Sequence, residues 1–260
     1  MDSEERILIE DVFGLSLTDI CGGALERLSE EDKERLEELK KRLKEGEPVQ
    51  YITGKAPFCG YNFHVASGVL IPRPETEELV EKISAKAAEC SHRLSILDIG
   101  TGSGCIAVTM ALGGNDVTAW DISDDALSIA RENAERLGAA VTFEKRDILR
   151  SRDNRESKSW DIIISNPPYI CKKEAADMES NVLDHEPHIA LFVPDDEPLL
   201  FYDAIARYGT LNLKDGGMLA FEINPLYAEK LATLLADLGY HDVEIHQDSF
   251  GKKRFIICYR

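Results

Sequence analysis

The chain has 260 residues and a net charge of −18, enough for one large domain or for a domain and a smaller module. The acidic balance argues against DNA or RNA as the main contact, without excluding a locally basic groove, and suits either a basic protein partner or plain solubility. The six cysteines contain no C-x-x-C pair, which argues against zinc and disulfides and fits a reducing cytosol, and neither a signal peptide nor a membrane-spanning apolar run is evident.

Residues 1–46 have the pattern of a small helical module. Apolar residues recur at helical spacing in its first part, at Ile7, Leu8, Val12 and Leu15. A second helix follows Ser29, a good N-cap, and ends at Gly46. Its apolar stripe consists of Leu36, Leu39 and Leu43. Residues 47–70 mix aromatic and aliphatic residues with glycines and prolines, which predicts short strands and a β-hairpin that links the module to the next domain.

Residues 71–260 alternate apolar strands with helices. The predicted strands are Ile96–Ile99, Val117–Asp121, Val141–Glu144, Trp160–Ser165, Gly217–Ile223, Val243–His246 and Phe255–Tyr259. The predicted helices are Glu75–Ala88, one directly after residue 104, Asp124–Leu137, Leu199–Tyr208 and Tyr227–Leu238. This alternation indicates an α/β fold, a parallel sheet covered on both faces, with the last two strands antiparallel. Residues 150–159 are expected to form an exposed loop, and residues 171–198 a long irregular segment.

The tetrapeptide Asn166-Pro167-Pro168-Tyr169 ends a strand that reads as buried on both faces. The prolines stop the strand, so its tip lies where ligands bind in open α/β sheets. The Asn166 side-chain oxygen and the Pro167 carbonyl are two acceptors that could grip both hydrogens of a substrate –NH2 group. Tyr169 offers an aromatic face for a planar group. The pattern therefore predicts a site for a planar primary amine or amide.

A second set of residues predicts a nucleotide site at the neighbouring strand ends. Glycines at positions 100, 102 and 104 follow the first strand, Asp121 ends the second, and Asp147 and Ile148 follow the third. Asp121 is placed to hold ribose hydroxyls, Asp147 to accept from an adenine amino group, and Ile148 to pack on the ring. Gly102-x-Gly104-x-x-Ala107 formally fits a dinucleotide fingerprint, but the set as a whole suits S-adenosylmethionine better.

The motifs together resemble the HemK/PrmC family, the release factor glutamine methyltransferases. The resemblance rests on D-I-G-T-G-S-G at residues 98–104, on N-P-P-Y, on Tyr51-Ile52-x-Gly54 with Phe58, and on L-I-P-R-P-E-T-E at residues 70–77. It implies a Rossmann-like seven-stranded methyltransferase sheet with a small N-terminal helical domain and a β-hairpin linker. It also implies three parts: a substrate-docking domain at 1–46, the linker at 47–70, and an S-adenosylmethionine-dependent methyltransferase domain at 71–260.

The resemblance further implies the reaction and its residues: methylation of the glutamine side-chain nitrogen in the Gly-Gly-Gln tripeptide of peptide-chain release factors. Cofactor binding would fall to Gly100, Thr101, Gly102, Ser103, Gly104, Asp121, Asp147, Ile148 and Asn166. The catalytic residues would be Asn166, Pro167 and Tyr169, and substrate binding would add Pro168, Arg73 and Glu75. Two departures stand out: the family often has Glu-Ile-Gly where this chain has Glu222-Ile223-Asn224, and the N-terminal module is short.

Several alternatives stay open at this point. The same tetrapeptide can grip adenine N6 in nucleic acid, relatives that methylate a ribosomal-protein glutamine share much of the pattern, and a non-enzymatic scaffold is conceivable. Arg73 and Glu75 could line the site or pair with one another. No general base is evident, and His185 and His188 favour a surface or packing role over metal binding. We expect a cytoplasmic monomer that uses no metal and has no direct contact with nucleic acid or membrane.

Overall fold

The computed structural model describes residues 1–260, with the exception of the Asp177 side chain. Its N-terminal helices are α1 (Ser3–Phe13), α2 (Leu17–Cys21), the 3-10 turn η1 (Leu25–Arg27), α3 (Glu30–Lys44) and α4 (Val49–Thr53). Ser29 caps α3 by accepting a hydrogen bond from the Asp32 N–H, as predicted. These helices share a small core of Leu8, Ile9, Leu36, Leu39 and Val49. Of the apolar residues expected at helical spacing in α1, Leu8 is buried but Ile7 is exposed, and Ile9 is buried instead.

The linker is a helix followed by a hairpin. Residues 49–53 were expected to be extended, but they form α4, because Val49 and Ile52, three positions apart, both pack into the N-terminal core. The predicted hairpin is present as β1 (Lys55–Phe58) and β2 (Tyr61–His64). Its two-residue turn, Cys59-Gly60, has positive φ at both positions, the conformation that matches the twist of a hairpin.

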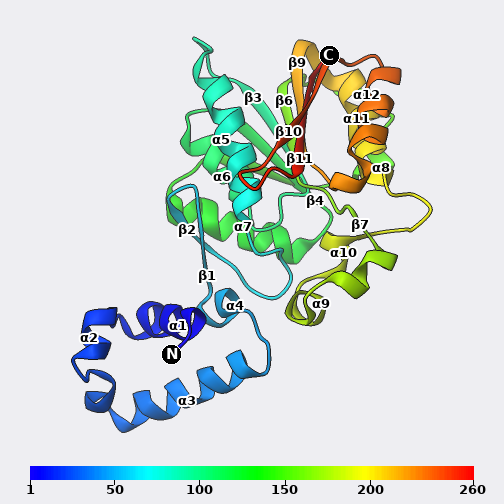
Figure 1. The fold of residues 1–260 in the computed structure, drawn as a ribbon. Coiled ribbons are helices and arrows are strands. Elements are labelled where there is room, and N and C mark those ends of the chain that lie inside the picture. The colour runs from blue at the N-terminus through cyan, green and yellow to red at the C-terminus, as the bar shows by residue number, and fades with distance from the viewer.

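A seven-stranded sheet forms the centre of the large domain, as predicted (Figure 1). Its strands are β3 (Ser95–Ile99), β4 (Asp116–Asp121), β5 (Val141–Lys145), β6 (Trp160–Ser165), β9 (Leu213–Glu222), β10 (His241–Gln247) and β11 (Lys253–Tyr259). The strand order is β10-β11-β9-β6-β3-β4-β5; β11 pairs antiparallel with β10 and β9, and the remaining pairs are parallel. The chain passes from β3 to β4 and β5 on one side and then returns to β6 on the other. A ligand crevice is expected at such a reversal.

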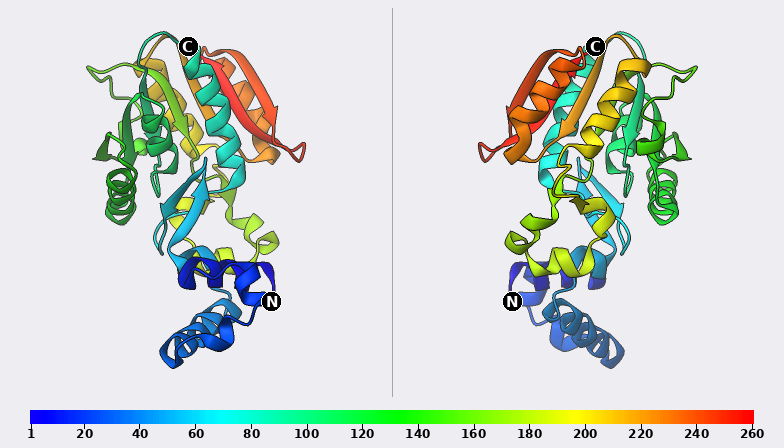
Figure 2. Two further views of the ribbon diagram at one scale, coloured as in Figure 1. Left: turned by 90° about the vertical axis from the view of Figure 1, so that its left-hand side faces the viewer. Right: turned by 90° about the vertical axis from the view of Figure 1, so that its right-hand side faces the viewer.

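Helices cover both faces of this sheet (Figure 2). One face carries α5 (Pro74–Ala88), α6 (Cys105–Leu112) and α7 (Asp124–Leu137), and the other carries α8 (Ile148–Ser151), α11 (Leu200–Asn212) and α12 (Ala228–Asp237). Strand β6 shows the alternation behind these two layers, because Ile162 and Ile164 pack into one core and Ile163 into the other. β9 begins four residues before the predicted Gly217, at Leu213, which pairs with Trp160; the register then shifts before Met218 pairs with Ile162.

The segment after β6 was predicted to be irregular, but short elements organise it. These are β7 (Ile170–Cys171), η2 (Lys172–Asp177), α9 (Ser180–His185), α10 (His188–Leu191) and β8 (Phe192–Val193). β7 and β8 pair in parallel and so close the segment into a compact flap. Likewise, the predicted loop at 150–159 begins with the last turn of α8.

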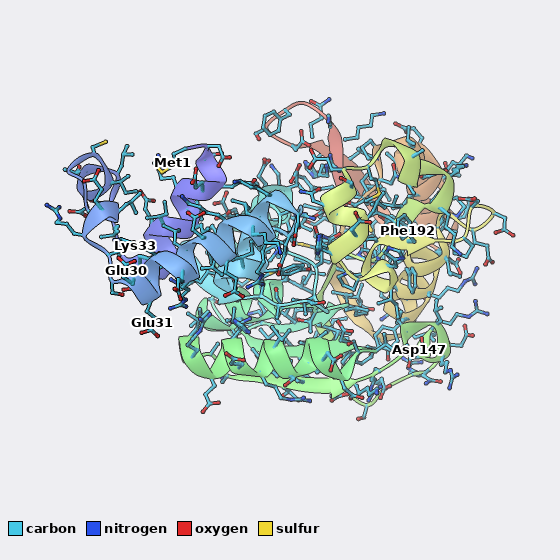
Figure 3. All side chains as sticks on the ribbon, turned by 90° about the horizontal axis from the view of Figure 1, so that it is seen from below. Met1, Glu30, Glu31, Lys33, Asp147 and Phe192 are labelled. Carbon is cyan, nitrogen blue, oxygen red and sulfur yellow. The ribbon has the colours of Figure 1, made fainter. Side chains whose placement is uncertain are left out.

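Seen from below, Glu30, Glu31 and Lys33 lie on the N-terminal helices, well away from Phe192 and Asp147 (Figure 3). No helix among the described residues is long and apolar enough to cross a membrane.

Candidate active site

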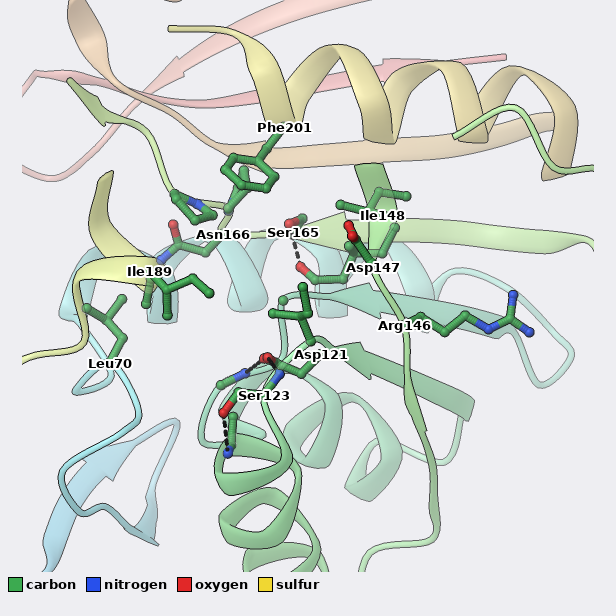
Figure 4. Close-up of a pocket in the computed structure, with 18 of the residues that line it drawn as sticks. Leu70, Asp121, Ser123, Arg146, Asp147, Ile148, Ser165, Asn166, Ile189 and Phe201 are labelled. Carbon is green, nitrogen blue, oxygen red and sulfur yellow. Dashed lines mark hydrogen bonds between the residues drawn. The ribbon is translucent and has the colours of Figure 1, made fainter. Parts of the chain in front are cut away.

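A cavity of about 280 Å³ opens beyond the carboxyl ends of β3, β4 and β6, at the reversal of strand order (Figure 4). This volume is close to the lower end of the range for small-molecule sites, about 300–1,000 Å³. Six of the predicted cofactor residues line this cavity: Gly100, Gly102, Asp121, Asp147, Ile148 and Asn166. Pro167 and Pro168 line it as well. Apolar side chains from α10 and α11, Ile189 and Phe201, complete its wall.

The glycine loop after β3 gives the cavity its floor. Gly100 and Gly102 have φ of 78° and 54°, a conformation that side chains disfavour, and each presents bare backbone. Gly104 does not line the cavity; a Cβ there would lie 3.0 Å from the Cβ of Ala130, so this glycine lets α6 and α7 approach. The buried Thr101 points the other way and donates to Asp98, 2.6 Å away. Ser103 is also buried and off the cavity wall.

Asp121 ties the glycine loop to the end of β4. One of its carboxylate oxygens accepts from the Gly102 N–H and the other from the Ser123 N–H, both at 2.9 Å (Figure 4). Burial raises the pKa of this carboxyl, an effect that the backbone N–H groups oppose. Asp147 caps α8 by accepting from the Leu149 N–H at 2.9 Å. Both acids therefore lie at the cavity wall in positions fixed by local backbone contacts.

A second cavity, of about 300 Å³, lies on the other side of the Asn166 tip. Its walls include Arg73, Tyr169 and Glu222. Leu70, Asn166 and Ala190 line both cavities, so they form the partition between them. A donor bound in one cavity and an acceptor bound in the other would therefore meet at Asn166. Glu75 lines neither cavity, although it belongs to the same turn of α5 as Thr76.

Hydrogen bonds hold the Asn166 tip against α5 and β9. The Asn166 Nδ2 group donates to Thr76 Oγ1 at 3.1 Å, and the Thr76 hydroxyl donates to Glu222 at 2.5 Å. The Tyr169 hydroxyl donates to the other Glu222 oxygen at 3.1 Å. Sequence reasoning named Asn166 and Tyr169 but missed the roles of Thr76 and Glu222. A signal was present, since Glu222 is an acid at the end of an apolar strand and Thr76 lies inside the L-I-P-R-P-E-T-E motif.

Two further contacts fix the walls of the second cavity. Arg73 pairs with Glu186, whose side chain is almost fully buried, and not with Glu75. Glu186 also accepts from the Ile71 N–H, so it fastens the flap to the chain before α5. Asn224, the departure from glycine, donates to the Tyr169 carbonyl at 3.1 Å and to Glu174 at 3.0 Å. Among the described residues, no cluster of three or more His, Cys, Asp or Glu side chains could hold a metal ion.

Comparisons with known proteins place this geometry in a family. The Methyltransferase small domain model matches residues 74–186, and the PrmC N-terminal domain model matches residues 2–54. A release factor glutamine methyltransferase from Bacteroides thetaiotaomicron is 48% identical over 252 residues, which cover 96% of this chain and 89% of the relative. The chain belongs to the release factor glutamine methyltransferases. Their Bacillus subtilis member is 39% identical, over 98% of this chain and 90% of the relative.

Solved structures share the fold of this chain at low sequence identity. The Thermus thermophilus 16S rRNA N2 G1207 methyltransferase, in complex with AdoMet and guanosine, has a TM-score of 0.59 at 17% identity and covers 79% of this chain and 49% of its own. A methyltransferase from Pyrococcus furiosus has a TM-score of 0.53 at 19% identity and covers 77% and 89%. At these identities the likeness shows the methyltransferase fold alone. The N-terminal family model ends at residue 54, where Gly54 terminates α4.

Proposed function

We propose that this enzyme binds S-adenosylmethionine in the first cavity and the glutamine side chain of a release factor in the second. The protein is an S-adenosylmethionine-dependent methyltransferase that modifies the side-chain amide nitrogen of the glutamine in the Gly-Gly-Gln motif of peptide-chain release factors, and so modulates translation termination. The observation that carries the assignment of the two sites is the partition at Asn166, a side chain that lines both cavities.

The residues of the first cavity fit S-adenosylmethionine. The bare backbone of Gly100 and Gly102 leaves room for close approach, and the Asp121 carboxylate at the end of β4 is placed to accept from ribose hydroxyls. We propose that Asp147 accepts from the adenine amino group and that Ile148 packs on the ring. The bound group supplies an electrophilic methyl on a sulfonium. For Thr101, Ser103 and Gly104 we propose an indirect contribution, through the shape of the loop.

The second cavity suits a carboxamide. We propose that the glutamine –NH2 group reaches the partition, where Asn166 Oδ1 and the Pro167 carbonyl, on the wall of the first cavity, each accept one of its hydrogens. The Pro167-Pro168 pair fixes the spacing of these acceptors, and the Tyr169 ring in the second cavity stacks on the amide plane. An amide nitrogen is a weak nucleophile, so orientation supplies most of the rate. Effective molarity can contribute about 7–11 kcal/mol. Carbonyl dipoles also stabilise the positive charge that develops on nitrogen during the transfer. Arg73 stabilises the neighbouring wall of the second cavity through its ion pair with Glu186.

We further propose a role for each of three parts of the chain. Residues 1–46 bind the release factor, residues 47–70 connect this domain to the catalytic domain, and residues 71–260 form the methyltransferase domain. The N-terminal helices have their own small core, which supports a separate docking unit. The hairpin holds this unit through Phe58 and Phe63, which pack edge to face within the core of the large domain. The described cysteines are all unpaired, in keeping with action in the cytoplasm, where release factors work.

The direct test is methyl transfer from labelled S-adenosylmethionine to three macromolecules offered separately: a full-length release factor, total ribosomal protein and DNA. We expect label on the release factor alone, and peptide mapping should place it on the glutamine of Gly-Gly-Gln. A release factor with that glutamine changed to glutamate is the matched control and should take up no label. Preferred labelling of DNA or of a ribosomal protein would contradict the assignment.

A further inference from the structure

The hydrogen bonds behind Asn166 form a chain of three links that ends on a buried acid. Thr76 comes from α5, Asn166 and Tyr169 follow β6, and Glu222 is the last residue of β9. Thr76 and Glu222 are 3% and 1% exposed, so bulk water does not compete for these bonds. Three elements far apart in the sequence therefore meet at one carboxylate, beside the Asn166 partition and in the wall of the second cavity.

Counting the hydrogens in this chain fixes the orientation of the Asn166 amide. An ionised Glu222 can only accept, and its two oxygens receive the single hydroxyl hydrogens of Thr76 and Tyr169. Because the Thr76 hydrogen is used in this way, Thr76 Oγ1 has only lone pairs left for Asn166. The Asn166 group that faces Thr76 must then be the Nδ2 donor. Its Oδ1 is left free to accept from a ligand in the cavity.

We propose that Glu222 and Thr76 are positioning residues that dictate which end of the Asn166 amide faces the substrate. This inference rests on the proposed function, because it concerns the acceptor that grips the glutamine –NH2 group. With the opposite orientation, Asn166 would present its own N–H groups to the substrate N–H groups, and two donors cannot hydrogen-bond. Tyr169 is held by the same carboxylate, so one buried charge aligns both the acceptor and the stacking ring.

The protonation state of Glu222 controls this arrangement. A protonated Glu222 carries a hydrogen of its own, which it can donate to Thr76; the Thr76 hydroxyl is then free to donate to Asn166 and to favour the wrong orientation. Burial raises the pKa of Glu222 and nearby Glu75 adds to this effect, whereas the Thr76 and Tyr169 hydroxyls and Arg254 on β11 lower it. The rate should therefore fall as the pH falls through a pKa above that of an ordinary glutamate.

The test compares Glu222→Gln, Thr76→Val and Thr76→Ser in the full-length enzyme, with release factor as substrate and saturating S-adenosylmethionine. Glu222→Gln keeps the shape but adds a donor, and Thr76→Val removes the hydroxyl. We expect each to lower kcat about 10- to 100-fold, the range for groups that orient a functional residue indirectly. Cofactor affinity should be unchanged. Thr76→Ser should restore most of the rate, and Glu222→Gln should abolish the acidic limb of the pH profile. Glu229→Gln, an exposed acid on α12, is the matched control.

The outcomes separate this inference from the proposed function. If Glu222→Gln keeps the kcat and the pH profile of the natural enzyme, the inference is overturned, while methylation of the release factor by the unaltered chain leaves the function intact. If Glu222→Gln is inactive but Thr76→Val is fully active, Glu222 does not act through Asn166, which also overturns it. Should Glu222→Gln fail to fold, the Thr76→Val and Thr76→Ser pair decides the matter. If the unaltered enzyme does not methylate the release factor, both the proposed function and this inference are contradicted.

Discussion

The two cavities that meet at Asn166 are built by different means. Backbone shapes the first, since its floor is a glycine loop and its two acids lie at the ends of strands, Asp121 as the last residue of β4 and Asp147 two residues after β5. Side chains shape the second, and they come from distant parts of the sequence: Thr76 reaches Glu222 across 146 positions, and Arg73 reaches Glu186 across 113. The first construction follows from a fold that distant methyltransferases share. The second is where the proposed function places the substrate. Substitutions on the two sides should therefore have separable effects.

The largest effect is expected at the partition itself. Asn166→Ala removes the side-chain acceptor for the glutamine amide but leaves the glycine loop untouched. We expect kcat to fall by about 10³-fold or more, comparable to the loss of one preorganised hydrogen-bonding group elsewhere. Binding of S-adenosylmethionine, measured by calorimetry, should change little. Asn154→Ala, in an exposed loop, is the control. Full activity of Asn166→Ala on intact release factor would show that Asn166 does not hold the glutamine amide.

On the cofactor side, a buried acid under the glycine loop makes folding depend on pH. Burial raises the pKa of Asp98 to about 7, while an unfolded aspartate titrates near 3.8. The folded chain therefore holds a proton that the unfolded chain releases, and stability is lost as the pH rises from about 4 to about 7. Asp98→Asn should flatten this dependence and at pH 8 should raise the unfolding free energy by at most about 4 kcal/mol. Denaturant titrations at pH 5 and pH 8 measure it.

The exposed Asp215→Asn is the control for this comparison, because it changes the net charge equally without touching the loop. Equal slopes of stability against pH in Asp98→Asn and in the unaltered chain would show that Asp98 is ionised in the fold throughout.

A moderate effect, confined to the cofactor, is expected at Asp121. Asp121→Asn keeps the size of the side chain, but it offers fewer acceptors to the Gly102 and Ser123 N–H groups and to a ribose. Hydrogen bonds to charged groups contribute about 1.5–3 kcal/mol, so S-adenosylmethionine should bind roughly 10- to 100-fold more weakly. The KM for release factor at saturating cofactor should be nearly constant. Asp125→Asn, exposed on α7, serves as the control. A change in the KM for release factor alone, with cofactor affinity unchanged, would contradict the assignment of Asp121 to the cofactor cavity.

The smallest effect is expected at the outer wall of the substrate cavity. Arg73→Ala leaves Glu186 buried without its cation, although Arg73 itself is 33% exposed, which reduces the cost. We expect a loss of about 1–2 kcal/mol in unfolding free energy together with a raised KM for release factor. Arg207→Ala, which breaks an exposed pair with Asp203, should cost less than about 1 kcal/mol. If the cofactor affinity fell instead of the release factor affinity, Arg73 would belong to the first cavity.

The same division explains what could be predicted from sequence. The sheet, the Asp124–Leu137 helix and the strand before Asn166 follow from local hydrophobic periodicity and turn residues, and the structure confirms them. Positions 100, 102, 121 and 147 could be named because each lies at or just after the carboxyl end of one of three predicted strands. Thr76, Glu186 and Glu222 could not be paired with Asn166 or Arg73, because their contacts depend on how distant elements pack. The helix at Val49–Thr53 was missed since its five residues are held by tertiary contacts and carry little local signal.

The most direct test of the account is a crystal structure of the enzyme with S-adenosylhomocysteine and a peptide that contains Gly-Gly-Gln. We expect the sulfur in the cavity lined by Gly100 and Asp121, and the glutamine amide on the other side of Asn166, with its nitrogen hydrogen-bonded to Asn166 Oδ1 and the Pro167 carbonyl. The amide nitrogen should face the sulfur directly. A glutamine bound away from Asn166, or an Asn166 amide that presents its Nδ2 to the ligand, would contradict it.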